Sequence, residues 1–310
     1  MSSRTHAEEG TITLKDSGWN RIDTKFPINI KASLESGQPL SFHSTYNITN
    51  GIARVCYVTR NGVIELSYKE GRLQDTLFFR HHGKYTKKTA SEEITKRFGL
   101  EDDMEDIYKK ISTDKHIKKA IDSHYGLRVT HNDPWETTLC FVISQFNNIK
   151  RIKGIVRNLI NSYGMELESG NTLTHIFPEP EAIADASIGD LVKAGAGFRA
   201  KYIKNVATAV SNNFDLDKIH GMDYREGKEY LMEMEGIGDK VADCILLMGY
   251  KKLNAFPIDV WIKRSMEDLY MKNRKANISE IHSLADEKWG GYAGYAQQYL
   301  FHHARNPVYQ

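Results

Sequence analysis

The run from Met234 to Ala242 places a lysine directly after a glycine-rich turn, and these residue types can support nucleophilic chemistry. Gly236 and Gly238 allow the backbone to turn sharply and to approach another molecule closely. The helix expected next begins with N–H groups that lack partners, which makes a binding site for phosphate. Lys240 lies in its first turn, where the helix dipole disfavours a positive charge. We therefore expect some neutral amine there, which can attack carbon and form a Schiff base.

Cys244 and Met248 follow Lys240 by four and eight residues, so the three side chains share one face of the expected helix. Their polarisable sulfur atoms could line a pocket for an aromatic base. A structural interpretation stays open for each feature. Gly-x-Gly turns, surface lysines and buried cysteine or methionine residues are all common in proteins without a site at that position.

Two further segments carry groups suited to the same chemistry. Asp259 follows a Pro-Ile pair where another helix should begin, so it could be an N-cap or could hold negative charge against a developing cation. Gln297 and Phe301 are one helical turn apart and could present an amide and an aromatic ring together. The alternative for this pair is simple packing of a terminal helix.

The residues that precede these segments indicate a sheet. From about residue 10 to 95 the chain is rich in β-branched and aromatic side chains, and Asn61-Gly62 separates the runs 54–60 and 63–68. Asn-Gly between such runs is a strong hairpin signal, because both turn residues tolerate positive φ. Residues 77–80 could form a further strand. An antiparallel sheet is therefore expected.

After about residue 95 the pattern favours helices. Pro134 begins one, with Asp133 as its expected N-cap. Ser187 is expected to cap a short helix. The other helices are expected at residues 151–163, 201–212, 224–234, 241–248, 260–270, 278–289 and 292–303.

Composition excludes several classes of protein. The 310 residues are 40% apolar and 26% charged, which is typical of a globular protein, and they include no apolar run long enough to span a membrane. The first ten residues lack the apolar region of a secretory signal. Three scattered cysteines cannot supply a four-cysteine zinc site or an iron–sulfur cluster, so we assign no metal and no cofactor, and we expect a reduced, intracellular location. The net charge of +2 does not itself indicate a nucleic-acid partner.

The run from Met234 to Asp259 resembles the helix–hairpin–helix plus Gly/Pro…Asp motif of the base-excision DNA glycosylase superfamily. The resemblance is closest to the eukaryotic-type 8-oxoguanine DNA glycosylase/AP lyases, because Lys240 to Cys244 resembles their catalytic lysine segment. Residues 36–38, 133–136, 144–152, 195–202 and 289–301 also match in the same order. The resemblance implies an α+β fold, with an antiparallel sheet domain at 1–110 and two helical subdomains within 111–310, which carry the hairpin at 234–242 and flank a DNA-binding cleft.

The resemblance also implies roles for individual residues. Lys240 would be the nucleophile and Asp259 its acidic partner. Gly37 would accept the N7–H of 8-oxoguanine with its backbone carbonyl, and Gln297 would contact the Watson–Crick edge. The remaining base-binding residues would be Cys244, Met248 and Phe301, of which the first and last sandwich the base.

On the DNA side, Phe198 would act as a wedge and Arg199 would face the orphaned cytosine. Asn148 and Arg151 would handle the gap and the opposite strand. The other DNA-binding positions would be Gly236, Gly238, Val241 and Trp261.

Two positions depart from the family pattern. Phe146 replaces the first of three asparagines that fill the hole left by the flipped base, so we expect weaker discrimination for cytosine opposite the lesion. Trp261 replaces a histidine that contacts the lesion phosphate, and it brings no charge.

The sequence thus predicts a monomeric, bifunctional DNA glycosylase/AP lyase that flips an oxidised purine out of double-stranded DNA. A Schiff base on Lys240 and β-elimination would follow. Two alternatives remain at this point. A monofunctional glycosylase for alkylated bases would lack the lysine, and a non-catalytic DNA-binding protein would use the hairpin only as a phosphate clamp.

Overall fold

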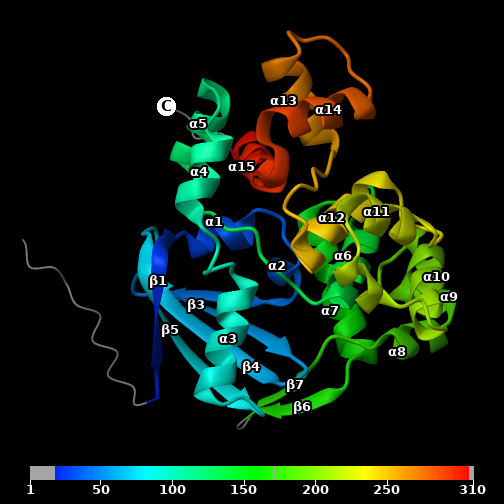
Figure 1. Ribbon diagram of the computed structural model, residues 1–310. Coiled ribbons are helices and arrows are strands. Elements are labelled where there is room, and N and C mark those ends of the chain that lie inside the picture. The colour runs from blue at the N-terminus through cyan, green and yellow to red at the C-terminus, as the bar shows by residue number, and fades with distance from the viewer. Residues whose placement is uncertain (1–17, 170–171, 307–310) are drawn as a thin grey trace, which may run out of the picture.

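A five-stranded antiparallel sheet forms the N-terminal part of the computed structural model, which describes residues 18–169 and 172–306 (Figure 1). The strand order is β1-β5-β4-β3-β2. The strands are β1 (Asn20–Ile28), β2 (Thr45–Thr49), β3 (Ile52–Thr59), β4 (Gly62–Lys69) and β5 (Gln74–Gly83). Two short helices, α1 (Ile30–Glu35) and α2 (Leu40–His43), connect β1 to β2. The expected strand at 77–80 is part of β5. The expected sheet residues before position 18 lie outside the described residues.

The expected hairpin at Asn61-Gly62 is confirmed, with its turn one residue earlier than expected. Thr59 pairs with Gly62, so Arg60 and Asn61 form the turn and Gly62 begins β4. Gly62 has φ +141°, and a Cβ on it would lie 1.9 Å from the carbonyl oxygen of His82. The close pairing of β4 with β5 is the physical reason for this glycine.

Helices make up most of the remaining described chain, and each helix expected from the sequence is present within a few residues of its predicted bounds. They are α3 (Lys87–Arg97), α4 (Met104–Ile111), α5 (Lys115–Ser123), α6 (Pro134–Ser144), α7 (Ile149–Tyr163), α8 (Pro180–Asp185), α9 (Ile188–Lys193), α10 (Arg199–Ser211), η1 (Leu216–Gly221), α11 (Tyr224–Met232), α12 (Asp239–Tyr250), α13 (Val260–Tyr270), α14 (Ile278–Trp289), η2 (Gly290–Tyr292) and α15 (Ala293–Arg305). The expected caps Asp133 and Ser187 accept backbone hydrogen bonds at the starts of α6 and α9. A small hairpin of β6 (Glu166–Ser169) and β7 (Thr172–His175) was not expected.

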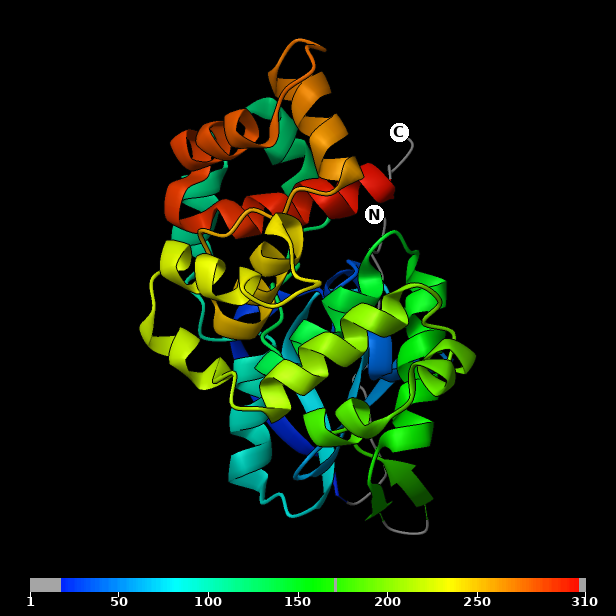
Figure 2. The same ribbon diagram turned by 90° about the vertical axis from the view of Figure 1, so that its right-hand side faces the viewer.

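The helices fall into two groups. Early helices α4 and α5 lie with α13, α14 and α15 in one group, and α6 to α12 form the other beside the sheet (Figures 1 and 2). Buried residues of the sheet cluster extend to Leu100, whereas Met104 and the buried residues after it belong to the helical cluster. The domain division expected near residue 110 stays a prediction.

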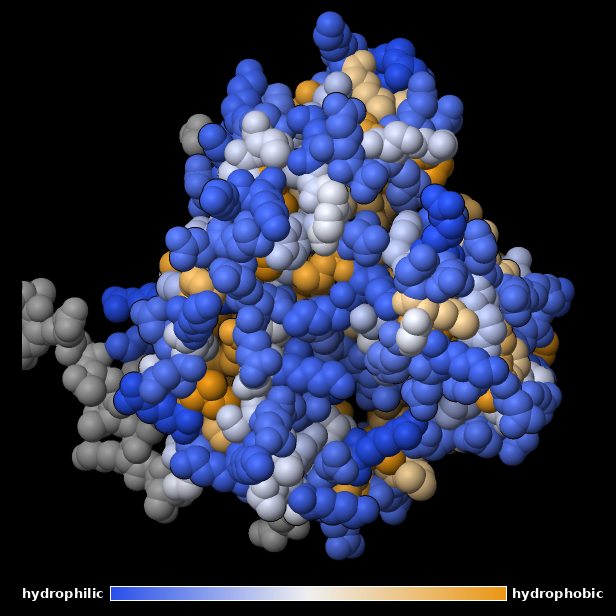
Figure 3. Space-filling model, viewed as in Figure 1, coloured by the Kyte–Doolittle hydropathy of each residue, from blue (hydrophilic) through white to orange (hydrophobic). Residues whose placement is uncertain are grey.

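Polar side chains cover most of the face seen in Figure 1 (Figure 3). None of the described helices combines the length and apolar character needed to cross a bilayer.

Gly62→Ala should destabilise the protein by about 1–3 kcal/mol, because it adds both an unfavourable φ and a contact with a backbone oxygen. The midpoint of urea unfolding measures this loss. Gly221→Ala is the matched control, since a Cβ there meets no atom within 4 Å. Equal midpoints for the two variants would contradict the steric argument.

Candidate active site

A cavity of about 270 Å³ lies where the loop after α1 meets α7, α12, the start of α13 and α15. It brings together residues that are distant in sequence. Nine of the predicted site residues line it: Gly37, Asn148, Lys240, Cys244, Met248, Asp259, Trp261, Gln297 and Phe301. Phe141 and Gln298, which the sequence analysis did not single out, also line the cavity.

Lys240 is the second residue of α12, as expected, and Gly238 is the N-cap. Gly238 has no side chain to cap the helix, and the first backbone bond is from Ala242 N–H to the Gly238 carbonyl. Within the described chain no group accepts from the N–H groups of Asp239, Lys240 and Val241. The hairpin therefore presents a set of unpaired amides that suits an anion.

The Lys240 Nζ atom lies 5.0 Å from the centre of the Phe141 ring. Among the described residues Lys240 forms no ion pair, although it shares the cavity with Asp259. Burial raises the pKa of Cys244 to about 11, while Lys240 acts to lower it. Cys244 is therefore a neutral thiol near pH 7 rather than a thiolate nucleophile.

Asp259 combines both roles considered for it. Its Oδ1 atom caps α13 by accepting from the N–H groups of Trp261 at 3.0 Å and Ile262 at 2.8 Å. Among the described residues no donor contacts its Oδ2 atom. One carboxylate oxygen thus fixes the side chain at the cavity, and the other is available to face positive charge.

Gly37 forms part of the cavity wall, and a side chain at this position would be crowded. Its φ is +76°, and an added Cβ would lie 3.2 Å from the Phe301 ring and 3.4 Å from Ile149. No donor of the described residues contacts its carbonyl oxygen. Gln298 donates to the neighbouring Ser36 carbonyl at 2.7 Å and so joins this loop to α15.

Gln38 secures the other side of the loop. It is fully buried, its amide nitrogen donates to the Arg128 carbonyl at 2.8 Å, and its amide oxygen accepts from the Thr130 N–H at 2.7 Å.

Gln297 is 5% exposed, and its Oε1 atom is buried without a hydrogen-bond partner. Leaving such an atom unpaired costs about 1–3 kcal/mol, so it is favourable for a bound molecule to supply a donor here. Together with the free carbonyl of Gly37, this makes a cavity with acceptors for N–H groups between apolar walls.

Two aromatic rings project from the protein beside the cavity. Phe146 is 93% exposed and Phe198 is 59% exposed, and their ring centres are 6.4 Å apart. Phe146 has φ +47°, which is unusual for a non-glycine residue. The exposed aromatic character of Phe198 fits the expected wedge, and Phe146 adds a second ring that the family pattern lacks.

Arg199 is buried rather than free at the surface. Its guanidinium donates to the carbonyl oxygens of Gln145, Phe146 and Ala196. The first two of these hydrogen bonds hold the loop that contains Phe146. The expected contact to an orphaned cytosine stays a prediction, and it would require some of these bonds to break. Arg151 is exposed, and its Nη2 atom lies 3.5 Å from the Gly195 carbonyl, so it is a cation near this loop that an anionic partner can reach.

The two hairpin glycines differ in the physical reason for having no side chain. Gly236 has φ +111°, and a Cβ on it would lie 2.8 Å from the Tyr202 Cβ. Gly238 has φ −102° and open space around it, so nothing among the described residues demands a glycine there. Close approach of another molecule is the remaining physical reason. Val241 is buried, so only its backbone could meet that molecule.

Known proteins are similar to this chain in fold and in sequence. Residues 22–138 match the family model for the 8-oxoguanine DNA glycosylase N-terminal domain, and residues 139–290 match that for HhH-GPD superfamily base excision DNA repair proteins. A probable N-glycosylase/DNA lyase of Methanothermobacter thermautotrophicus is 34% identical over 70% of this chain and 76% of its own.

Two solved structures are similar over nearly their whole length. MBOgg1, solved with a low-affinity DNA ligand, has a TM-score of 0.82 and 32% identity, with 93% of this chain and 98% of that one covered. The 8-oxoguanine glycosylase/lyase of Clostridium acetobutylicum, solved with double-stranded DNA containing cytosine opposite 8-oxoG, has a TM-score of 0.80 and 28% identity, with 92% and 97% covered.

Arg199→Met should release the Phe146 loop, because two loop carbonyls lose their buried donor and nothing then compensates the positive φ. We expect a loss of about 1–3 kcal/mol in stability and faster amide hydrogen exchange at residues 145–148. Arg151→Met, which removes an exposed cation nearby, is the control and should leave exchange unchanged. Slow exchange in both variants would show that the loop does not depend on Arg199.

Proposed function

Because this chain belongs to the 8-oxoguanine DNA glycosylase family of HhH-GPD base excision DNA repair proteins, we propose that it excises 8-oxoguanine from double-stranded DNA and then nicks the strand. The observation that carries the proposal is one cavity that holds Lys240, Asp259 and the unpaired amide oxygen of Gln297. We propose that the protein acts as a monomer inside the cell, where its DNA substrate lies, without a cofactor for this reaction.

Recognition begins with extrusion of the lesion, because a base inside a duplex cannot reach the cavity. Extrusion costs about a few kcal/mol, which Phe198 and Phe146 offset in part by stacking beside the gap. The flipped base lies between Cys244 and Phe301, near Met248. The Gly37 carbonyl accepts the N7–H that guanine lacks, and Gln297 accepts from the Watson–Crick edge. Guanine leaves the Gly37 acceptor unpaired, at about 1–3 kcal/mol.

Chemistry starts when the neutral Lys240 amine attacks C1′. The N–C1′ bond forms as the glycosidic bond breaks, and the base departs with its electron pair and takes up the proton that the newly bonded amine loses. Positive charge develops on the sugar, and the free carboxylate oxygen of Asp259 stabilises it. The sugar ring then opens to a Schiff base. Loss of a proton from C2′ expels the 3′ phosphate oxygen, which nicks the strand.

The phosphate backbone contacts surround this centre. The unpaired amides at Asp239, Lys240 and Val241 hold one phosphate, with close approach permitted at Gly236 and Gly238. Trp261 is 41% exposed at the cavity and supplies an indole ring rather than a charge. Asn148 and Arg151 lie at the start of α7, beside the gap, and contact the opposite strand.

The two alternatives make different use of the cavity. A monofunctional glycosylase for alkylated bases needs the aspartate alone, and the position of Lys240 in the same cavity argues against it. A non-catalytic protein would bind duplex DNA with strong salt dependence and release no base.

Lys240→Gln should keep lesion binding but reduce strand nicking by roughly a thousandfold or more, because the amide cannot form a Schiff base. The assay is nicking of an 8-oxoguanine oligonucleotide, with borohydride to trap the covalent adduct of the unaltered protein. Lys118→Gln changes an exposed lysine on α5 and should be fully active and trapped. Failure of the unaltered protein to form an adduct would reject the lyase step, and an active Lys240→Gln variant would remove this residue from the mechanism.

Phe146→Asn should sharpen the preference for cytosine opposite the lesion by about tenfold, because an amide can form directed hydrogen bonds that a phenyl ring cannot. Excision rates on duplexes with each of the four opposite bases measure this change. Phe198→Asn is the matched control, and it should lower the rate on all four duplexes alike. An unchanged profile in the Phe146 variant would refute the role given to this position.

A further inference from the structure

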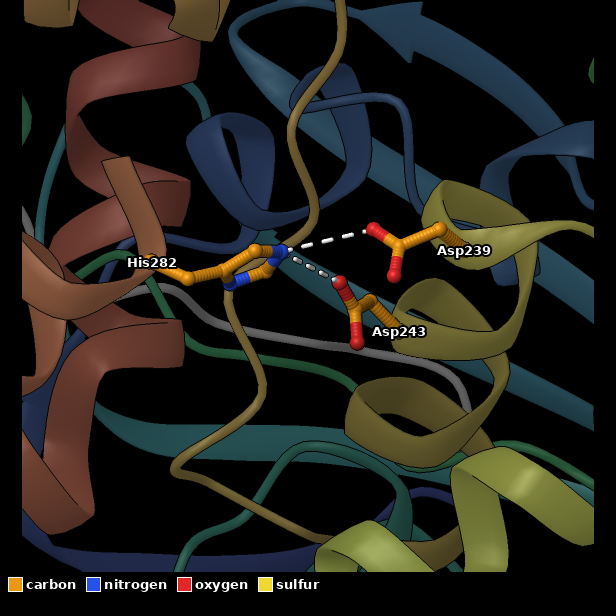
Figure 4. Close-up of side chains that lie close together, drawn as sticks. All are labelled: Asp239, Asp243 and His282. Carbon is orange, nitrogen blue, oxygen red and sulfur yellow. Dashed lines mark hydrogen bonds and ion pairs between the residues drawn. The ribbon is translucent and has the colours of Figure 1, made fainter. Parts of the chain in front are cut away.

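A second cluster of charged groups lies on another face of α12 from Lys240. Asp239 and Asp243 are one turn apart on that helix, and His282 of α14 points toward both of them (Figure 4). One ligand atom from each of the three residues lies within 4.8 Å of the others. A cavity of about 530 Å³ is lined by Asp239 and His282 and opens beside the cluster. A small solute in this cavity can therefore reach Asp239 and His282.

Lys228 forms an ion pair with only one oxygen of each carboxylate. Its Nζ atom lies 2.8 Å from Asp239 Oδ1 and 2.9 Å from Asp243 Oδ1, and the Tyr224 hydroxyl donates to the same Asp243 atom at 2.7 Å. Neither Lys228 nor Tyr224 contacts the Oδ2 atom of either carboxylate. Asp243 is fully buried, and its Oδ2 atom has no hydrogen-bond partner. Binding of a cation is favourable at a buried carboxylate oxygen that no hydrogen-bond donor contacts.

His282 approaches these remaining oxygens at a distance that suits a bridging ion. Its Nε2 atom forms a long hydrogen bond with Asp239 Oδ2 at 3.4 Å and an ion-pair contact with Asp243 Oδ2 at 3.5 Å, and both distances exceed those of a strong hydrogen bond. Ligand atoms bound to tetrahedral zinc at about 2.0–2.1 Å are about 3.3–3.4 Å from one another. The two nitrogen–oxygen distances match that arrangement, and all three ligand atoms lie within 4.8 Å of one another.

We propose that Asp239, Asp243 and His282 bind one Zn²⁺ ion, with water from the adjoining cavity as the fourth ligand. One imidazole with two carboxylates suits zinc, whereas Mg²⁺ and Ca²⁺ prefer oxygen ligands alone. Lys228 and Tyr224 hold the second oxygens and orient the carboxylates, as partners behind a metal ligand commonly do. The ion fixes the first turn of α12 to α14, and Asp239 directly precedes Lys240. Zinc is therefore a positioning element for the helix that carries the nucleophile.

The test uses the full chain after treatment with a chelator. Calorimetric titration with Zn²⁺ should show one binding site whose affinity depends on His282. Co²⁺ in place of Zn²⁺ should give the intense visible absorption of a tetrahedral centre. Binding should raise the melting temperature by a few degrees, because the ion binds the folded state. The absence of any bound equivalent in the unaltered protein overturns the proposal.

His282→Gln should weaken Zn²⁺ binding at least about 100-fold, since loss of a partner behind a ligand alone weakens it about 10–100-fold. His124→Gln is the matched control, because His124 packs against His302 and His303, with ring centres 4.4 and 5.7 Å apart, in a separate group of histidines. Binding lost in the His124 variant and kept in the His282 variant overturns the assignment. If His282→Gln does not fold in the presence of chelator, Asp239→Asn replaces it. The same loss of Zn²⁺ binding is expected for that variant. Zn²⁺ binding that persists in it would contradict the proposed site.

Discussion

The hydrogen bond from Gln298 to the Ser36 carbonyl joins helix α15 to the loop after α1 at the cavity, and the site depends on that junction. It holds the Gly37 backbone against the ring of Phe301, where an added Cβ would be crowded at 3.2 Å. Gln38 secures the other side of the same loop through Arg128 and Thr130. One wall of the cavity is consequently main chain, whose acceptors cannot rotate away as side-chain groups can.

Local patterns in the sequence were sufficient to predict the β3–β4 hairpin, the caps of α6 and α9, and the cavity-lining set on α12 and α15. These features depend on neighbours within a few positions, or on motifs that a family retains. The burial of Arg199 could not be predicted in this way, because it depends on carbonyls of a loop more than fifty positions earlier. The approach of His282 to Asp243 is equally non-local. The β6–β7 hairpin, in contrast, has a local signal that the sequence analysis missed, because Gly170-Asn171 separates its two short runs.

The exposed pair of Phe146 and Phe198 has a consequence for how the protein holds DNA. Rings that face water in the free protein lose that exposure when bases stack on them, and this gain does not depend on releasing counterions from phosphates. Part of the affinity for a distorted or opened duplex should therefore survive at ionic strengths that weaken contacts to the regular backbone. High salt would then favour damaged over intact DNA, because only an opened helix offers unstacked bases to these rings.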